Sequence, residues 1–344
     1  MQACRHIAGA ATSQSLSLVY DAPGEPADVL RLAESGPLAD PGHGEMAVQF
    51  LLAPINPSDI NTVQGKYPLQ PTLPGTPGHE GVARVLAAGP GVEHCREGDL
   101  VVPLEPAQGT WRQRALVRAS AFHALHPDTP LEAAATLCIN PPTALAMLET
   151  FVELKEGDVI VQNGGTSAVG QLVTQLARAR GVKTVSVIRP RPDWEATVQR
   201  LKGLGADLVT TDSALKEDLK AAKLGPTPLL GLNCVGGTSA LALCKVLGEG
   251  GTLVTYGGMS MQPVTIPTSL LIFKDLQFKG FWLSGRFARE QGAVKRAASL
   301  DYLAKLAAQG QLYTRTVHFP LAQWREALAA PSTGAKVLLD MESS

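Results

Sequence analysis

The sequence lacks the features that mark several common classes of protein. Its five cysteines form no C-x-x-C pair, and aromatic residues occupy only 5% of the 344 positions. No apolar run approaches the ~20 residues that a membrane-spanning helix needs. The formal net charge is −1. These absences exclude a disulfide scaffold and membrane insertion, they favour a reducing compartment, and they leave no general attraction to nucleic acid.

The first twenty residues carry few acidic side chains. The stretch "MQACRHIAGAATSQSLSLVY" includes Arg5 and His6, several serines and alanines, and no acid before Asp21. This composition suits an organellar transit peptide, complete or trimmed. The alternative is a disordered start that leads into the first strand. A secretory signal is excluded because there is no compact apolar centre.

The pattern of apolar and turn-forming residues changes along the chain, which is long enough for two domains. Residues 21–137 are rich in short apolar segments bounded by Gly, Asp and Pro, as in a β-rich domain. Residues 138–285 alternate between strand and helix patterns. Residues 286–344 contain an amphipathic helix, a strand, a second helix and a final strand, and we expect them to return to the first domain.

The alternating region predicts an α/β fold with a parallel, doubly wound sheet. Its first strand, 158–163, runs into "GGTSAVG", which opens the helix "QLVTQLARARG". A helix N-terminus offers free N–H groups and a positive dipole end to a pyrophosphate. The dinucleotide fingerprint places Gly at three positions, which here hold Gly165, Ser167 and Gly170. Although the middle glycine is missing, the strand-turn-helix setting favours a cofactor site over a purely structural turn.

The end of the second predicted strand distinguishes between the two nicotinamide cofactors. An NAD enzyme usually has Asp or Glu there, bonded to the ribose 2′-OH. This sequence has "SVIRPRPDW", with Arg189 and Arg191 at that place and Asp193 beyond the strand. Two guanidinium groups suit a 2′-phosphate. The pattern therefore predicts NADPH, against the alternative of two solvated loop arginines.

These motifs and those of the first domain together resemble the medium-chain dehydrogenase/reductase superfamily. Within it the chain resembles the trans-2-enoyl thioester reductases of mitochondrial fatty-acid synthesis. The resemblance covers most of residues 15–340. The residues that carry it are "INPSDIN" (55–61), "GKY" (65–67), "GTWR" (109–112), "TLCINPPTA" (136–144), "RPRPD" (189–193), "LNCVGG" (232–237), "TLVTYGGM" (252–259) and "LIFKDLQFKGFWLS" (271–284).

The resemblance implies a Rossmann domain at 138–285, and a GroES-like catalytic domain made of 21–137 and 286–344. It implies NADPH-dependent reduction of a trans-2-enoyl thioester, bound to coenzyme A or to acyl carrier protein, to the saturated acyl thioester. Tyr67 matches the family's proton donor, and a phenol stays protonated at neutral pH yet can donate to a developing carbanion. The alternative for Tyr67 is aromatic packing beside a proline-rich loop.

The resemblance also implies a set of cofactor contacts. They are Asn140, Thr166, Ser167, Ala168, Val169, Arg189, Arg191, Tyr256, Gly257, Gly258, Met259, Phe281, Trp282, Leu283 and Lys336. Tyr256 to Gly258 follow a predicted parallel strand at the sheet edge where ligands bind. Trp282 is expected either to line the active cleft or to be a core aromatic, and Asn140 would otherwise be a turn residue before proline.

A short motif, "GHEG" at 78–81, points instead to zinc-dependent relatives of this family. A catalytic zinc needs about three protein ligands. Those relatives have a cysteine where this chain has Asn56, and Cys138 is one position away from a second ligand position. His123 and His126 are expected to be surface residues. We therefore expect no metal site, with His79 hydrogen-bonded below the cleft and Glu80 either its partner or a structural acceptor.

Other functions remain open at this stage. An NADPH:quinone oxidoreductase shares the zinc-less fold and needs no proton donor at Tyr67. Non-enzymatic relatives of this fold serve as lens crystallins or RNA-binding proteins, which the neutral charge and the retained Tyr67, Arg189 and Arg191 disfavour. The resemblance further implies a homodimer and a mitochondrial location, with plastid and cytoplasm as alternatives.

Overall fold

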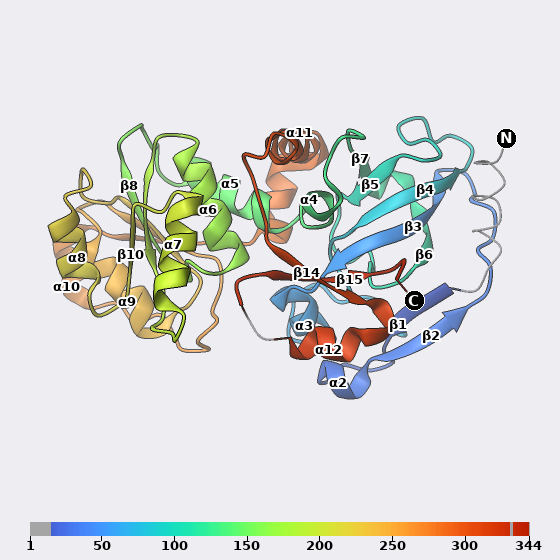
Figure 1. Cartoon of the computed structure of the whole chain (residues 1–344), viewed down its shortest axis with the longest axis horizontal. Helices are drawn as coiled ribbons and strands as arrows, with labels where there is room; N and C mark the ends of the chain where they lie inside the picture. Colours follow the sequence, from blue (N-terminus) through green and yellow to red (C-terminus); the bar gives the residue numbers. More distant parts are fainter. Residues whose placement is uncertain (1–14, 331–332, 344) are drawn as a thin grey trace. The chain divides into compact units, whose positions relative to one another are not determined.

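The structure, a computed structural model, describes residues 15–330 and 333–343. The chain folds into two compact units (Figure 1). Unit 1 comprises Met1–Ile139 and Gln291–Ser344, and unit 2 comprises Asn140–Glu290. The C-terminal segment thus belongs with the N-terminal one. These divisions lie two and five residues from the boundaries expected at 137/138 and 285/286.

Unit 1 is built on a mixed sheet in which β3 is central. The strand order is β14-β15-β3-β4-β5-β7, and β6 also pairs with β3. The strands are β3 (Glu45–Pro54), β4 (Val82–Ala88), β5 (Leu100–Pro103), β6 (Arg114–Arg118), β7 (Phe122–Ala124), β14 (Thr316–Pro320) and β15 (Lys336–Asp340). Because β15 pairs antiparallel with β3, the last strand of the chain lies beside the strand that enters the predicted catalytic loop.

Short helices and turns complete unit 1. They are α2 (Pro26–Val29), α3 (Pro57–Val63), η1 (Ala119–Ala121), α4 (Leu131–Ala135), η3 (Leu321–Gln323) and α12 (Trp324–Ala329), and α11 (Ala288–Ala308) begins in unit 2 and continues into unit 1. The core holds the fully buried side chains of Tyr20, Phe50 and Trp111. The indole N–H of Trp111 donates to the carbonyl of Pro54 at 3.1 Å, so this aromatic group also fixes the end of β3.

The first described strand begins inside the range expected to precede the fold. Residues 1–14 of that range lie outside the described part of the chain. Ser15–Val19 form β1, which pairs antiparallel with β2 (Arg31–Ser35). Leu18 and Tyr20 are fully buried. The prediction of an unfolded or removable start is therefore wrong from Ser15 onward, because alternating apolar residues there join the core.

Unit 2 is a parallel six-stranded sheet in the order β10-β9-β8-β11-β12-β13. The strands are β8 (Val159–Asn163), β9 (Lys183–Val187), β10 (Leu208–Thr210), β11 (Leu230–Asn233), β12 (Thr252–Thr255) and β13 (Gln277–Gly280). Counted from β8, this is the order 3-2-1-4-5-6 of the dinucleotide-binding fold. The predicted fold class, a Rossmann sheet with a second β-rich domain, is confirmed.

Helices connect these strands (Figure 1). They are α5 (Asn140–Thr150), α6 (Ala168–Arg178), α7 (Trp194–Leu204), α8 (Leu215–Ala222), α9 (Gly237–Val246) and α10 (Thr268–Lys274), followed by a π-helical turn, η2 (Leu283–Phe287). Helix α6 packs against α5 and α7, and α8 packs against α9. Within the described ranges, no helix has both the length and the apolar character to cross a bilayer.

A ladder of buried amides joins the carboxyl ends of three neighbouring strands. Asn163, at the end of β8, donates to Asn233 at the end of β11 at 2.7 Å, and Asn233 donates to Thr255 at the end of β12 at 3.1 Å. The Asn163 oxygen also accepts the N–H of Cys234 at 2.8 Å. We call Asn163, Asn233 and Thr255 the amide ladder. It holds the loops that follow these strands, at the edge where such sheets bind ligands.

We expect Asn163→Leu to lower the free energy of unfolding by about 2–4 kcal/mol, because it leaves the buried Cys234 N–H without a partner and removes one donor from the Asn233 oxygen. Calorimetric thermal unfolding measures this. Asn61→Leu, on an exposed side chain, is the matched control and should leave the midpoint nearly unchanged. Equal stability of the Asn163 variant and the wild type would contradict the role of the ladder.

Candidate active site

The first part of the site is the turn from β3 into α3. Asn56 follows β3, which ends at Pro54, and it is the N-cap residue of α3, which has Pro57 as its first residue. The fully buried carboxylate of Asp59 accepts the backbone N–H of Asn56 at 2.8 Å and that of His79 at 2.9 Å. Asp59 therefore joins the start of α3 to the "GHEG" loop. Burial raises the pKa of Asp59, although the two N–H donors and Lys336 act in the opposite direction.

His79 is a buried, neutral histidine whose ring nitrogens are both engaged. Its Nδ1 accepts the N–H of Ala107 at 3.1 Å, so the proton lies on Nε2, which is 2.8 Å from the hydroxyl oxygen of Thr62. That hydroxyl donates to the carbonyl of Ser58 at 2.9 Å, which leaves its oxygen free to accept. The expectation of a hydrogen-bonded His79 is confirmed.

The backbone conformation and close packing at position 78 explain why a glycine precedes His79. Its φ is +110°, and a Cβ added there would lie 2.3 Å from the Oγ1 of Thr110. Only glycine tolerates both the conformation and the close approach. The "GHEG" motif is thus accounted for by backbone packing and by hydrogen bonds.

Glu80 and Lys336 form a buried charged network with Asn56. The Asn56 amide donates to Glu80 at 2.8 Å, and the Lys336 ammonium donates to the Asn56 oxygen. The second Glu80 oxygen accepts the N–H groups of Cys138 and Ile139 at 3.0 and 2.9 Å. Of the two roles expected for Glu80, the structure supports the acceptor and not the partner of His79. Burial raises the pKa of Glu80 to about 7 and lowers the pKa of Lys336.

These side chains do not fit a zinc ion. The lone pair of His79 faces a backbone N–H, and Asn56 stands where a cysteine ligand would be. Cys138 is buried, and burial raises the pKa of its thiol, the reverse of what a thiolate ligand requires. Among the described residues, no three His, Cys, Asp or Glu side chains are grouped as metal ligands. That the protein holds no metal stays a prediction.

Two further histidines lie elsewhere in unit 1. His126 is an exposed surface residue, as expected. His123 is only 19% exposed, and its Nε2 lies 2.7 Å from the carboxylate of Asp301 on α11. The prediction of a surface residue is wrong for His123, because pairing with α11 partly buries the ring.

Tyr67 lies four residues after the end of α3, and its ring is next to that of His79. Its ring centroid is 5.3 Å from that of His79, with a tilt of 55° between the planes. The N–H groups of Lys66 and Tyr67 both donate to the carbonyl of Asn61, at 2.8 and 3.1 Å, so the turn is held to the end of the helix. Tyr67 is half-buried. The structure therefore brings Tyr67, His79 and Asp59 into one hydrogen-bonded and packed group within unit 1.

The glycine-rich turn has the close packing of a dinucleotide site. A Cβ on Gly165 would lie 2.8 Å from the Cβ of Ser186, and one on Gly170 would lie 2.6 Å from the carbonyl oxygen of Gly164. Ser167, at the position of the missing glycine, caps α6 and accepts the N–H of Gly170 at 3.1 Å. Residues 166–169 are half-buried. The turn fits a pyrophosphate at the start of α6.

Arg189 and Arg191 follow β9 as predicted. Arg189 is exposed. Arg191 is 20% exposed, and its Nε is 3.7 Å from Asp193, too far for a hydrogen bond. This buried Nε has no hydrogen-bond partner in the described part of the chain. A guanidinium with an unused buried donor fits an anionic group such as a 2′-phosphate.

The remaining predicted contacts of unit 2 lie at the carboxyl ends of its strands. Tyr256 and Met259 donate backbone N–H groups to Asn233 and Cys234, at 3.0 Å each, which places the loop 256–259 beside the amide ladder. Burial raises the pKa of Tyr256, whose hydroxyl lies beside Cys234 and Ser167. Asn140 is the first residue of α5 and is buried.

The segment 281–283 combines buried and exposed side chains. Phe281 is buried in edge-to-face contacts with Phe151 and Phe287, at centroid distances of 6.0 and 5.1 Å. Leu283 is also buried, whereas Trp282 is 36% exposed. Of the two readings of Trp282, the structure excludes a fully buried core aromatic.

The sequence reading missed several residues that hold the site. Asp59 and Thr62 belong to a buried polar framework within unit 1, and Asn163 and Asn233 belong to a separate one within unit 2. Only the pattern Asn56-x-x-Asp59 at a helix start is a sequence signal for one of them. Of the predicted residues, Tyr67 and Lys336 lie in unit 1, and all the others lie in unit 2.

Comparison with known proteins places this geometry in a family. Residues 42–126 match the alcohol dehydrogenase GroES-like domain, and residues 168–299 match a family described as zinc-binding dehydrogenase. The mitochondrial enoyl-[acyl-carrier-protein] reductase of Arabidopsis thaliana is 44% identical over 317 residues, which cover 91% of this chain and 84% of the relative.

Two solved structures show the same likeness in three dimensions. The complex of Etr1p with NADP and crotonyl-CoA has a TM-score of 0.88 and 33% identity, over 95% of this chain and 99% of that one. The Etr1p/Etr2p heterodimer from Candida tropicalis, a mitochondrial 2-enoyl thioester reductase, has a TM-score of 0.87 at 33% identity and the same coverage. The chain therefore belongs to the family of the mitochondrial enoyl-[acyl-carrier-protein] reductases.

Proposed function

We propose that this protein reduces trans-2-enoyl thioesters to saturated acyl thioesters with NADPH, and that Tyr67 is its proton donor. The observation that carries the proposal is the setting of Tyr67, a phenol packed on a neutral histidine, in a chain that belongs to the enoyl reductases. The Etr1p complex, which contains NADP and crotonyl-CoA, supports the cofactor and the substrate class. Coenzyme A and acyl carrier protein are both proposed as carriers of the acyl group.

The residues of unit 2 that would hold NADPH have separate tasks. The turn 166–169 offers N–H groups at the start of α6 to the pyrophosphate, and Arg189 and Arg191 offer guanidinium donors to the 2′-phosphate. We assign further contacts to Asn140, Tyr256 to Met259 and Phe281 to Leu283, and one contact in unit 1 to Lys336. Bound NADPH supplies the hydride that adds to the β-carbon of the conjugated double bond.

Tyr67 completes the reduction. Addition of hydride at the β-carbon moves negative charge toward the α-carbon and the thioester oxygen, and a proton must then reach the α-carbon. A phenol with an ordinary pKa near 10 holds that proton at neutral pH and can release it to a carbanion. The product gains two hydrogens, one as hydride and one as the proton from Tyr67, which solvent then restores.

His79 positions Tyr67 by packing against it as an uncharged ring. Because both ring nitrogens of His79 are used, the imidazole cannot take a proton without losing the bond from Ala107. A cationic ring beside Tyr67 would favour the phenolate and weaken it as a proton reservoir. The neutral ring is therefore suited to a proton donor.

A homodimer is proposed through the free edge of the unit 2 sheet. Strand β13 is the last strand of that sheet, and all seven residues of the neighbouring α10 are at least partly exposed. Among them, Leu271, Ile272 and Phe273 are 43%, 66% and 78% exposed. Among the described strands β13 has no further neighbour at this edge, and an edge of this kind beside an exposed apolar helix suits a second copy. The Etr1p/Etr2p heterodimer shows that a relative assembles in pairs.

A mitochondrial location is proposed from the relatives' names.

We expect Tyr67→Phe to lower kcat/KM for crotonyl-CoA by about 10²–10⁴-fold, because the proton donor is lost while packing on His79 is kept. Stopped-flow or steady-state assays of NADPH oxidation measure this, with NADPH affinity measured in parallel and expected to be unchanged. Tyr302→Phe, at an exposed tyrosine of α11, is the control. Normal turnover by Tyr67→Phe, or faster turnover of a quinone than of crotonyl-CoA by the wild type, would overturn the proposal.

We expect the double variant Arg189→Glu/Arg191→Glu to raise the Kd for NADPH by about 100-fold and to leave the Kd for NADH nearly unchanged, since two charge-assisted bonds to the 2′-phosphate are removed. Fluorescence titration with each cofactor measures both constants. Arg178→Glu, an exposed arginine on α6, is the control. An unchanged preference for NADPH would show that these arginines do not read the phosphate.

We expect Ile272→Asp/Phe273→Asp to convert a dimer into monomers, because two carboxylates would be buried at the pairing face. Sedimentation velocity measures the mass. Val294→Asp, a substitution at an equally exposed apolar residue of unit 1, should leave the dimer intact. A wild-type monomer, or a double variant that is still dimeric, would refute the interface.

A further inference from the structure

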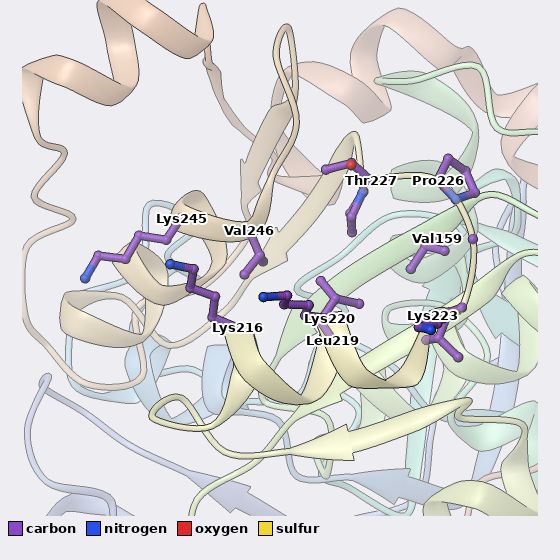
Figure 2. A pocket seen from close by; sticks show the side chains of 12 residues that line it. Val159, Lys216, Leu219, Lys220, Lys223, Pro226, Thr227, Lys245 and Val246 are labelled. Atoms are coloured by element: carbon purple, nitrogen blue, oxygen red, sulfur yellow. The ribbon is translucent and has the colours of Figure 1, made fainter.

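Unit 2 contains a second concave site with a high density of positive charge. Four lysines line it: Lys216 and Lys220 from α8, Lys223 directly after α8, and Lys245 from α9. We call this site the lysine pocket. In Figure 2, Lys216 and Lys220 project from α8 in the direction of Lys245, and Lys223 lies at the other end beside Val159. The cavity volume is about 320 Å³.

The lysine pocket lies at the opposite edge of the sheet from the glycine-rich turn. Val159, which lines the pocket, is the first residue of β8, and Gly164 follows the last residue of that strand. Four strand residues lie between Val159 and Gly164, and the five residue steps span about 16 Å at the usual rise. The residues 223–228 of the pocket precede β11 in the same way. The pocket is therefore separate from the proposed cofactor contacts.

In the described part of the chain, no carboxylate is paired with these lysines. None of the residues that line the pocket is acidic. Within residues 15–330 and 333–343, none of the four lysines forms an ion pair with a carboxylate, although several other basic residues of the chain do. All four side chains are exposed, so their ammonium groups are available to a ligand.

Helix stability accounts for only part of this arrangement. Lys220 and Lys245 lie in the last turns of α8 and α9, where the helix dipole favours a positive charge. Lys216 lies in the first turn of α8, where the dipole disfavours it, and it is four residues from Lys220, a spacing at which like charges repel. Lys223 has a φ of +48°, a left-handed conformation that is costly for a lysine. Helix stability therefore explains the places of Lys220 and Lys245 and does not by itself explain that of Lys216.

We propose that the lysine pocket binds a small organic polyanion, a molecule with two or more phosphate charges and an apolar or ring portion. The ammonium groups match the phosphates, while Val159, Leu219 and Val246 offer an apolar wall to the rest of the ligand. The volume is at the small end for organic ligands and excludes a folded protein domain. This site is additional to the proposed reductase activity and does not depend on it.

The experiment uses the full-length protein saturated with NADPH, so that the cofactor site is filled. Isothermal titration with ADP, inorganic pyrophosphate and adenosine separates the contributions of charge and ring. We expect ADP to bind more tightly than pyrophosphate, adenosine not to bind, and the affinity for ADP to fall as salt screens the ammonium groups. Failure of ADP and pyrophosphate to bind, or equal binding of adenosine, would overturn the proposal.

A matched pair of double variants assigns the binding to this pocket. We expect Lys216→Gln/Lys220→Gln to raise the Kd for ADP by about tenfold, the effect of losing two exposed charge contacts. Lys202→Gln/Lys305→Gln removes two exposed lysines outside the pocket and should leave that Kd unchanged. Reduction of crotonyl-CoA, measured for all three proteins, should be the same. An equal loss in both variants, or no loss in the first, would show that ADP binds elsewhere.

Discussion

The bond from the buried Lys336 ammonium to Asn56 is the interaction on which the unit 1 site depends. It joins the start of the last strand to the end of β3, 280 residues earlier in the chain. The Asn56 side-chain amide in turn donates to Glu80, and the Asp59 carboxylate accepts the backbone N–H groups of Asn56 and His79. The position of α3, and with it Tyr67, follows from this network.

The network consists of hydrogen bonds and a single ammonium group. A zinc site would need free lone pairs and ionised ligands, whereas here His79 is neutral and faces a backbone N–H. Lys336 supplies the positive charge that two buried carboxylates, Asp59 and Glu80, require, and it counteracts the effect of burial on the pKa of both.

The parts of the site that are local in sequence were predictable. The glycine-rich turn, the arginines after β9 and the position of Tyr67 each depend on spacing within one strand-turn-helix segment or on a continuous motif. The pairing of Lys336 with Asn56 and the amide ladder depend on residues 22 to 280 positions apart. The local sequence around an asparagine at the end of a strand does not show which other strand end this asparagine will contact. Tertiary packing decides those contacts. The first strand was missed because its alternation is short and follows an alanine- and serine-rich stretch.

The signs of the pKa shifts indicate what the network is for. Glu80 has an ordinary pKa of 4.5 that burial raises to about 7, so its contribution to stability is full below 4.5 and is lost as the pH rises through 7. Lys336 has a lowered pKa, so its contribution is present above the ordinary lysine pKa of 10.5 and is lost as the pH falls through the lowered value. In the neutral range both shifts therefore work against folding. A buried pair of this kind is weak evidence for stability, although removal of one partner alone typically costs about 3–5 kcal/mol. The network is better understood as a positioning device, which holds Asn56, Asp59 and the neutral His79 so that the Tyr67 phenol keeps one orientation.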